Sequence, residues 1–375
     1  MAPAVRQDLL PVHEGPRLIL YYQTHHDSLG NVISVLPLIT KSTGVTHVIV
    51  AAIHINNGPG NITLNDDPPD AAKFNTLWQE VAWLQGSGIK VMGMLGGAAH
   101  GSFLRLSGDD SSFEAYYRPL EEVVRRHRLD GLDLSIEEEI PVASVQRLLT
   151  RLRLDFGPSF ILSLAPVATA LIPGLPHLSG FSYFELETWC QSLVTSTPEA
   201  PPTAPIISFY SAITYCNWGD ASNPFLYASL IAQGWDPSRI VLGLITNPAN
   251  GAGHVHLPRM KTVLAAVRAA FPNFGGVMGW EYFNAGLERE GTNEPWEWAQ
   301  ELGSVIRTRS TGVQPSIDAR LRNPAQAWGG QLQTRWKGED LDTLMALGVD
   351  MAEAIQAMDA ADGNVDLAAS FLFDS

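Results

Sequence analysis

Apolar and polar residues follow two different periods along the first 285 residues. Eight short runs are apolar and rich in β-branched and aromatic residues, which is typical of buried strands. Stretches with apolar residues at helical spacing lie between most of these runs. Strands that alternate with helices indicate parallel βαβ units, and eight of them predict an α/β fold, the (β/α)8 TIM barrel. The strand runs are residues 17–23, 46–55, 89–97, 129–139, 160–168, 204–217, 239–246 and 275–284.

A doubly wound open sheet is the alternative arrangement for such a series. The first strand is not followed by a G-x-G-x-x-G turn, so nothing indicates a dinucleotide site, and we expect the barrel. The stretches with helical spacing are residues 71–88, 111–128, 142–153, 224–234, 260–272 and 295–308.

The fourth strand, within "LDGLDLSIEEEI" at residues 129–140, has two unlike faces. With a period of two, one face is apolar and the other is polar and acidic. Side chains at the carboxyl ends of barrel strands form the active site, and glycoside cleavage needs a carboxylic acid whose pKa is raised by burial and like charges. A cluster that only hydrates a loop and a site for a hard metal ion are the alternatives. The polar face consists of Asp133, Ser135, Glu137 and Glu139, and Glu137 is placed for the acid.

Other polar and aromatic residues gather at the ends of the later strands. Aromatic residues on barrel strands are often part of the core. A functional role for these residues is the better interpretation only because the carboxylate strand lies beside them. These residues are Tyr215, Asn217, Asn247, Trp280, Glu281 and Tyr282.

Composition narrows the classes of function. Of 375 residues, 45% are hydrophobic and 17% are charged, so the chain can bury a large core. The formal net charge of −15 argues against nucleic acid as a partner, because that binding depends on Lys and Arg. Cys190 and Cys216 lack metal-ligand spacing, and we expect reduced thiols. We expect no metal ion and no organic cofactor.

The ends of the chain bear on location and domain organisation. The N-terminus has no signal-peptide pattern, and no segment is apolar over the length of a membrane span. We therefore expect a soluble protein of the cytoplasm, or of the nucleus, with no membrane partner. The predicted parts are an N-terminal extension at 1–16, the barrel at 17–307, a linker at 308–337 and a small three-helix domain at 338–375.

"DGLDLSIE" at residues 130–137 resembles the D-G-x-D-x-D-x-E signature of glycoside hydrolase family 18, which contains chitinases and endo-β-N-acetylglucosaminidases. Supporting likenesses to other strands of that family are "KVMGMLGG" at 90–97, "ITYCNWG" at 213–219 and "GWEYFN" at 279–284. The resemblance spans most of residues 17–307 and implies the same barrel.

The resemblance also implies a role for each matching residue. Glu137 becomes the general acid and base, and Asp133 becomes the inner carboxylate of its network. Tyr215 hydrogen-bonds the N-acetyl group of the sugar, and Trp280 stacks under the sugar ring. The acetamido oxygen of the substrate takes the place of an enzyme nucleophile, with retention of configuration. Further substrate contacts are expected from Tyr22, Gly97, Glu139 and Asn217.

Ser135 departs from this signature. Family members mostly have an aspartate there, which orients the acetamide and balances the positive charge of the oxazolinium intermediate. A serine hydroxyl still accepts a hydrogen bond from the acetamide N–H, but it supplies no negative charge. Loss of one preorganised electrostatic partner costs about a hundredfold or more in rate. Catalysis is therefore expected to be weakened.

The C-terminal segment resembles a second family. "LMALGVD" at 344–350 resembles the first loop of a ubiquitin-associated (UBA) domain, a three-helix bundle, and "DGNVDLAASFLF" at 362–373 resembles the motif that opens its third helix. The resemblance implies ubiquitin or a ubiquitinated protein as a partner. A solubilising or dimerising helical cap is the alternative. The expected contact residues are Leu347, Gly348, Val349, Phe371 and Leu372.

Three functions remain open from these residues. The first is a glycosidase that cleaves β-1,4 bonds beside N-acetylglucosamine, in chitin-type oligosaccharides or in the core of N-glycans. The second is a glycan-binding adaptor with a degenerate site, which couples glycoproteins to ubiquitin. The third is a purely structural interaction protein. Ser135 favours the second, whereas Asp133, Glu137, Tyr215 and Trp280 favour the first.

Overall fold

The computed structural model describes residues 15–195, 205–287 and 293–307, and the single residues 340, 343, 344, 358, 361, 364, 365 and 369. The chain divides into two compact units, residues 1–321 and 322–375. In the second unit, Leu344 and Met358 are helical and buried. The predicted linker at 308–337 lies outside the described residues, as do the residues expected to contact ubiquitin, namely Leu347, Gly348, Val349, Phe371 and Leu372.

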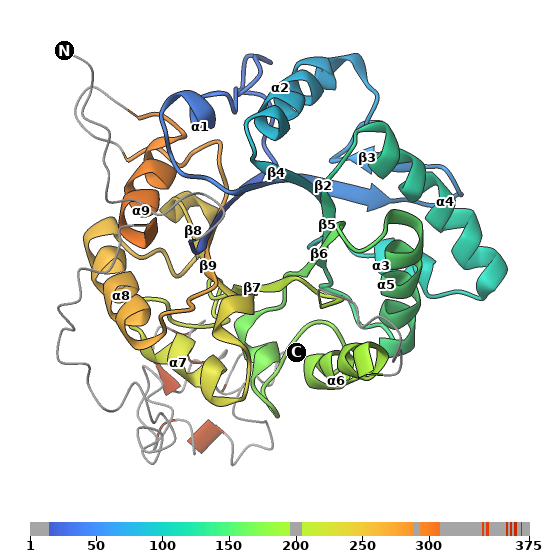
Figure 1. Ribbon diagram of the computed structural model, residues 1–375. Helices are drawn as coiled ribbons and strands as arrows, with labels where there is room; N and C mark the ends of the chain where they lie inside the picture. The colour runs from blue at the N-terminus through green and yellow to red at the C-terminus, as the bar shows by residue number, and fades with distance from the viewer. Residues whose placement is uncertain are drawn as a thin grey trace. The chain divides into compact units, whose positions relative to one another are not determined.

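Eight parallel strands of the first unit close into a barrel (Figure 1). Each strand pairs with its two neighbours, and the pairing of β1 with β2 completes the circle. The prediction of a TIM barrel is confirmed. The barrel strands are β1 (Arg17–Tyr22), β2 (His47–Ile55), β4 (Lys90–Gly96), β5 (Gly131–Ser135), β6 (Ile161–Leu164), β7 (Phe209–Ile213), β8 (Ile240–Ile245) and β9 (Gly276–Trp280). A short strand, β3 (Ile62–Leu64), pairs antiparallel with the end of β2.

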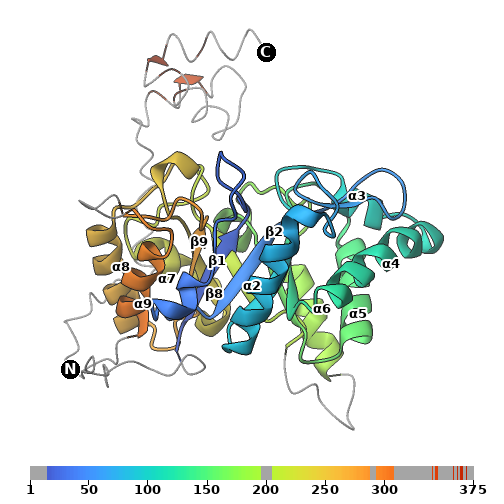
Figure 2. The same ribbon diagram turned by 90° about the horizontal axis from the view of Figure 1, so that it is seen from above.

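Helices surround the strands, as Figure 1 shows. In the side view of Figure 2, the short helix α3 lies beside the loops at one end of the barrel. No helix among the described residues combines the length and apolar character that crossing a membrane requires. The α-helices are α1 (Pro37–Thr40), α2 (Asn75–Gly86), α3 (Ser102–Leu106), α4 (Asp110–Arg126), α5 (Val142–Phe156), α6 (Tyr183–Thr195), α7 (Phe225–Ala232), α8 (Leu257–Ala270) and α9 (Glu297–Arg307), and the 3-10 turns are Ala72–Phe74, Ala168–Leu171, Pro237–Arg239 and Pro248–Asn250.

Helix α6 is absent from the predicted series. Its sequence, YFELETWCQSLVT, is rich in aromatic, β-branched and other residues of modest helix propensity. The helix is nevertheless amphipathic, because Tyr183, Leu186 and Cys190 recur at helical spacing and are buried. Tertiary packing on the barrel therefore decides this element, and local propensity does not.

The barrel has two apolar layers, one inside the strands and one between strands and helices. On β1, Ile19 and Tyr21 belong to the inner layer, whereas Leu18, Leu20 and Tyr22 belong to the outer one. Successive side chains of a strand point to opposite faces, so only one of two adjacent tyrosines can face the interior. That residue is Tyr21.

Strand β5 is shorter than predicted. It pairs with β4 only as far as Ser135, which lies opposite Gly96. Beyond that point the chain leaves the sheet, and the Ile140 N–H donates to the Ser179 carbonyl oxygen at 3.1 Å. The period of two therefore ends before the three glutamates, and Glu137 follows the strand in a loop.

Candidate active site

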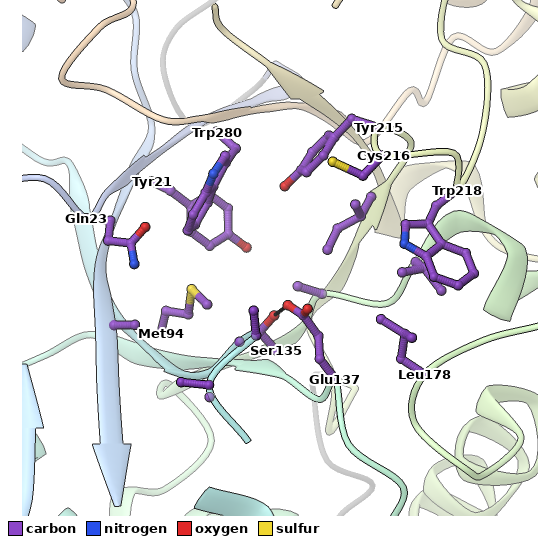
Figure 3. Close-up of a pocket in the computed structure, with 18 of the residues that line it drawn as sticks. Tyr21, Gln23, Met94, Ser135, Glu137, Leu178, Tyr215, Cys216, Trp218 and Trp280 are labelled. Carbon is purple, nitrogen blue, oxygen red and sulfur yellow. Dashed lines mark hydrogen bonds between the residues drawn. The ribbon is translucent and has the colours of Figure 1, made fainter. Parts of the chain in front are cut away.

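A pocket of about 460 Å³ opens where the barrel strands end. Figure 3 shows Tyr21 and Trp280 on one side of it and Tyr215 on another. Ser135 and Glu137 face these aromatic rings. Parallel strands bring their carboxyl ends to the same edge, so residues far apart in the sequence meet in this one cavity.

Asp133 lies beneath the pocket and is fully buried. The hydroxyl of Tyr21 donates to one of its carboxylate oxygens at 2.8 Å, and the hydroxyl of Ser163 donates to the other at 2.6 Å. Burial raises the pKa of Asp133 to about 6, although both hydrogen bonds act in the opposite direction. The inner carboxylate therefore changes its charge at mildly acidic pH.

Glu137 is the half-buried carboxyl of the pocket wall. The hydroxyl of Ser135 donates to its Oε1 atom at 3.2 Å. Burial raises the pKa of Glu137, while this hydrogen bond and the charge of His100 lower it to a smaller extent. A carboxyl with a raised pKa retains its proton to higher pH, as a general acid requires.

Trp280 ends β9 and stands against Tyr21, with ring centroids 5.4 Å apart and an angle of 56° between the rings. Its carbonyl oxygen accepts hydrogen bonds from the Thr246 N–H at 2.9 Å and from the side-chain amide of Asn250 at 2.9 Å. The peptide bond between Trp280 and Glu281 is cis. The backbone of Trp280 is thus held by the residues that follow β8, and its indole lines the cavity.

Tyr215 lies just beyond β7, and its hydroxyl points into the cavity (Figure 3). Burial, followed by the nearby Glu137 carboxyl, raises the pKa of Tyr215 well above its usual value. The hydroxyl therefore stays protonated at physiological pH and can donate a hydrogen bond to a ligand in the pocket.

Gly97 also lines the pocket. Its φ angle of +95° favours glycine, and a Cβ atom there would lie 2.6 Å from the Cε atom of Met94. Glycine at this position therefore keeps the wall open next to Glu137.

Three of the predicted substrate contacts do not line the pocket. Tyr22 faces the outer layer, and its hydroxyl donates to the Ile33 carbonyl oxygen at 2.7 Å. Glu139 is exposed outside the cavity, because the strand has ended and the alternation no longer applies. Asn217 is exposed, with a φ angle of +68° in the turn after β7. These three residues therefore lie outside the pocket that Ser135, Glu137, Tyr215 and Trp280 share.

Other residues of the pocket were not predicted. Tyr21 lines the pocket where Tyr22 was expected, and Trp218 lines it from the stretch "ITYCNWG", three residues past Tyr215. Polar side chains also reach the cavity from Gln23, His54 and Asn250. His54 lies near the end of β2, whereas Gln23 and Asn250 follow β1 and β8, and no recognised motif marked any of the three.

Comparison with known proteins gives the family. The model of glycosyl hydrolases family 18 matches residues 17–172. Chitinase ChiC from Aspergillus fumigatus is 51% identical, with a TM-score of 0.68, and the similarity covers 77% of this chain and 99% of that one. The chain belongs to glycosyl hydrolase family 18. A fungal endo-β-N-acetylglucosaminidase of family 18 is 40% identical, with a TM-score of 0.71, over 79% of this chain and 99% of that one.

A second similarity is short. DNA damage-inducible protein 1 from Cryptococcus neoformans is 56% identical over 39 residues, which is 10% of this chain. The chain spans only 9% of the length of that curated relative. The similarity therefore concerns a small part of both proteins.

Proposed function

We propose that this family 18 barrel hydrolyses β-1,4-linked N-acetylglucosamine with retention of configuration. The observation that carries the proposal is Glu137, a half-buried carboxyl with a raised pKa beside Ser135 and above the buried Asp133. Such a carboxyl can protonate a glycosidic oxygen. The similarity to a chitinase and to an endo-β-N-acetylglucosaminidase supports the same substrate class.

In the first step, the sugar ring stacks on Trp280 and its acetamido group is held between Tyr215 and Ser135. Glu137 gives its proton to the glycosidic oxygen, and the bond from that oxygen to the anomeric carbon breaks. The acetamido carbonyl oxygen attacks the same carbon from the opposite face. The leaving sugar departs, and an oxazolinium ion remains.

In the second step, the carboxylate of Glu137 takes a proton from a water molecule. That water attacks the anomeric carbon, and the bond to the acetamido oxygen breaks. Two inversions at one carbon give net retention, and Glu137 regains the proton that it lost. No nucleophile from the protein is needed.

Ser135 sets the expected rate. Its hydroxyl donates to Glu137, and its lone pairs remain available to the acetamide N–H of the substrate. It carries no negative charge, so it cannot balance the positive oxazolinium. The inner carboxylate left on β5 is Asp133, which is negatively charged above a pH of about 6. We expect turnover about a hundredfold slower than with an aspartate at this position.

The test uses fluorogenic N-acetylglucosamine oligomers and an N-glycopeptide with a chitobiose core. Three proteins are compared: the wild type, Glu137→Gln and Ser135→Asp. Turnover by the wild type that disappears in Glu137→Gln supports the proposed hydrolase. No turnover by the wild type or by Ser135→Asp, on either substrate class, excludes it.

A second candidate function is a glycan-binding adaptor, and Ser135 is the observation that favours it. In that case the pocket binds the same sugars without cleaving them. The outcome that supports it is sugar binding by an inactive wild type, with hydrolysis gained in Ser135→Asp. Isothermal titration calorimetry with an N-acetylglucosamine tetramer measures the binding in either case.

The adaptor function also needs a ubiquitin partner, for which residues 338–375 are proposed as a UBA-type three-helix domain in a cytoplasmic or nuclear protein. The two quoted motifs support this proposal. NMR titration of the full chain with ubiquitin tests it. Binding that is lost in Leu347→Asp supports the domain, and no shift in the ubiquitin spectrum excludes it.

A further inference from the structure

Glu138, the middle of three consecutive glutamates after β5, is directed away from the cavity that Glu137 lines. Glu138 is 6% exposed. One of its carboxylate oxygens accepts a hydrogen bond from the Gly101 N–H at 2.8 Å, and the other accepts one from the Phe103 N–H at 2.8 Å. These two donors lie at the start of α3, directly after the pocket wall at residues 97–99. Glu138 therefore ties the loop of Glu137 to the neighbouring part of the pocket wall, which continues from β4.

The opposite flank of the same loop is held by Ser179, which is 2% exposed. Its hydroxyl donates to the Ile136 carbonyl oxygen at 2.8 Å, and its carbonyl oxygen accepts the N–H of Ile140 at 3.1 Å. Residues 136–140 are thus held at both ends by Ser179 and in the middle, at Glu138, by the start of α3. Glu137 is the residue of this loop that lines the pocket.

Helix α3 is a firm anchor because it is attached to the barrel as well. The Ile55 N–H, at the end of β2, donates to the Ser102 hydroxyl oxygen at 3.1 Å. The guanidinium of Arg105 donates to the Ile55 carbonyl oxygen at 3.1 Å. The two hydrogen bonds of Glu138 therefore connect the loop of Glu137 through α3 to β2.

We propose that Glu138 is a positioning residue for Glu137. It lies outside the pocket, and it acts by holding the backbone that follows the acid, while Ser179 holds Ile136 in front of it. This inference rests on the proposed hydrolase, because proton transfer requires the acid within about 2.6–3.2 Å of the glycosidic oxygen. A displacement of about 1 Å can cost on the order of a hundredfold in rate. The consecutive glutamates thus divide their roles between chemistry at Glu137 and placement at Glu138.

Glu138→Gln is the direct test. It keeps the size of the side chain and one acceptor oxygen, but it sets an NH2 group against the second backbone N–H. Glu139→Gln makes the same change of charge one residue further on, at an exposed position outside the pocket. Glu80→Gln is the matched buried control, because Glu80 on α2 is 9% exposed and its carboxylate likewise accepts a backbone N–H, that of Val35, at 2.8 Å.

We expect kcat to fall about tenfold or more in Glu138→Gln, with KM changed by less than about threefold. Glu139→Gln and Glu80→Gln should stay within about twofold of the wild type in both constants. Amide hydrogen exchange at Gly101 and Phe103 should be faster in Glu138→Gln alone. All assays are run at a temperature where each variant is folded, as judged by thermal unfolding.

Two results overturn the inference. One is a kcat in Glu138→Gln equal to that of Glu80→Gln, and the other is faster exchange at α3 with unchanged kcat. If Glu138→Gln does not fold, Glu138→Asp tests the same two contacts with the charge retained and the side chain one methylene shorter. An inactive wild type removes the hydrolase and this role together, whereas an active wild type with an active Glu138→Gln removes only the role.

Discussion

Two walls of the pocket are built on different physical principles. The β5 wall is made of ionisable and hydroxyl groups whose places are set by hydrogen bonds. Asp133 accepts hydrogen bonds from two hydroxyl groups, and Glu137 accepts one from Ser135. Glu138 joins the loop that carries Glu137 to the start of α3. A change of one atom on this wall alters a charge or leaves a buried polar group without its partner.

The β7 wall is made of side chains whose places are set by packing and turn geometry. Cys216 has a φ angle of +54°, and its N–H donates to the Ala252 carbonyl oxygen at 2.9 Å. A Cβ atom on Gly251 would lie 2.7 Å from the Cys216 sulfur, so the β8 loop packs closely on this turn. Tyr215 and Trp218 are presented from this turn. The comparison teaches that chemistry is concentrated on one wall and shape on the other, so that changes on the two walls should have effects of different kinds.

The largest effect should separate the two walls directly. Glu137→Gln removes the only proton donor that we assign, so kcat should fall about a thousandfold or more, equivalent to ~4 kcal/mol. Tyr215→Phe on the facing wall removes one hydrogen bond and should cost about tenfold to a hundredfold. Steady-state kinetics on a fluorogenic N-acetylglucosamine oligomer measures both. Equal losses in the two variants would contradict the division of roles.

The next effect concerns stability and depends on pH. Burial raises the pKa of Asp133 to about 6 from an ordinary value of 3.8, so folding disfavours the charged form. Its contribution to the free energy of unfolding is complete well below pH 3.8 and is lost as the pH rises through about 6, by about 3 kcal/mol in all. Above that pH the contribution is constant.

Urea unfolding of the wild type and of Asp133→Asn between pH 4 and pH 7 measures this loss. Asparagine does not titrate, so the difference between the two free energies of unfolding should change by about 2 kcal/mol between pH 4 and pH 7, because part of the loss has already occurred at pH 4. Groups elsewhere in the chain cancel in that difference. A difference that stays constant with pH would show that Asp133 is not destabilised by its charge.

The β5 wall also shows how far the sequence predicts this site. The eight strands were predictable because each is a local apolar run, and the place of Glu137 at the carboxyl end of the fourth strand was predictable because the signature residues lie in one local stretch. The surroundings of Glu138 and Glu139 were not predictable, since the alternation was followed to Glu139 whereas β5 ends at Ser135. The end of the strand is decided by partners distant in sequence, such as Gly101 and Ser179.

Strand β1 shows a second limit. All but its first residue are buried, so both faces are apolar and the period of two does not tell the inner face from the outer. Tyr21 and Tyr22 are chemically identical neighbours, and only the closure of the barrel distinguishes them. The donor to Asp133 therefore became visible only in three dimensions.

Ser135→Asp, on the β5 wall, should raise the rate of hydrolysis. The added carboxylate balances the oxazolinium and orients the acetamide, so kcat should rise about a hundredfold, which is ~2.7 kcal/mol. A further carboxylate beside Asp133 and Glu137 should also lower the free energy of unfolding by about 1–2 kcal/mol through like-charge repulsion and burial. Kinetics and urea unfolding of the same preparation measure the two effects. Ser135→Asn, which is nearly the size of aspartate but neutral, is the control and should not raise kcat.

The smallest predicted effect on the kinetic constants is on the β7 wall. Trp218 is half-buried and lines the pocket, and Figure 3 shows it on the side that Leu178 shares. It has no hydrogen bond to the carboxylates, so its contribution to a sugar is apolar contact that is equal in the ground state and the transition state. Uniform binding of this kind changes KM and leaves kcat unaltered. Trp218→Ala should therefore raise KM about tenfold, or ~1.4 kcal/mol, with kcat within about twofold. Trp218→Phe should recover most of the loss because it keeps an aromatic face. A fall in kcat at unchanged KM would show that Trp218 acts on the chemical step, as the β5 residues do, and would contradict the distinction between the β5 wall and the β7 wall.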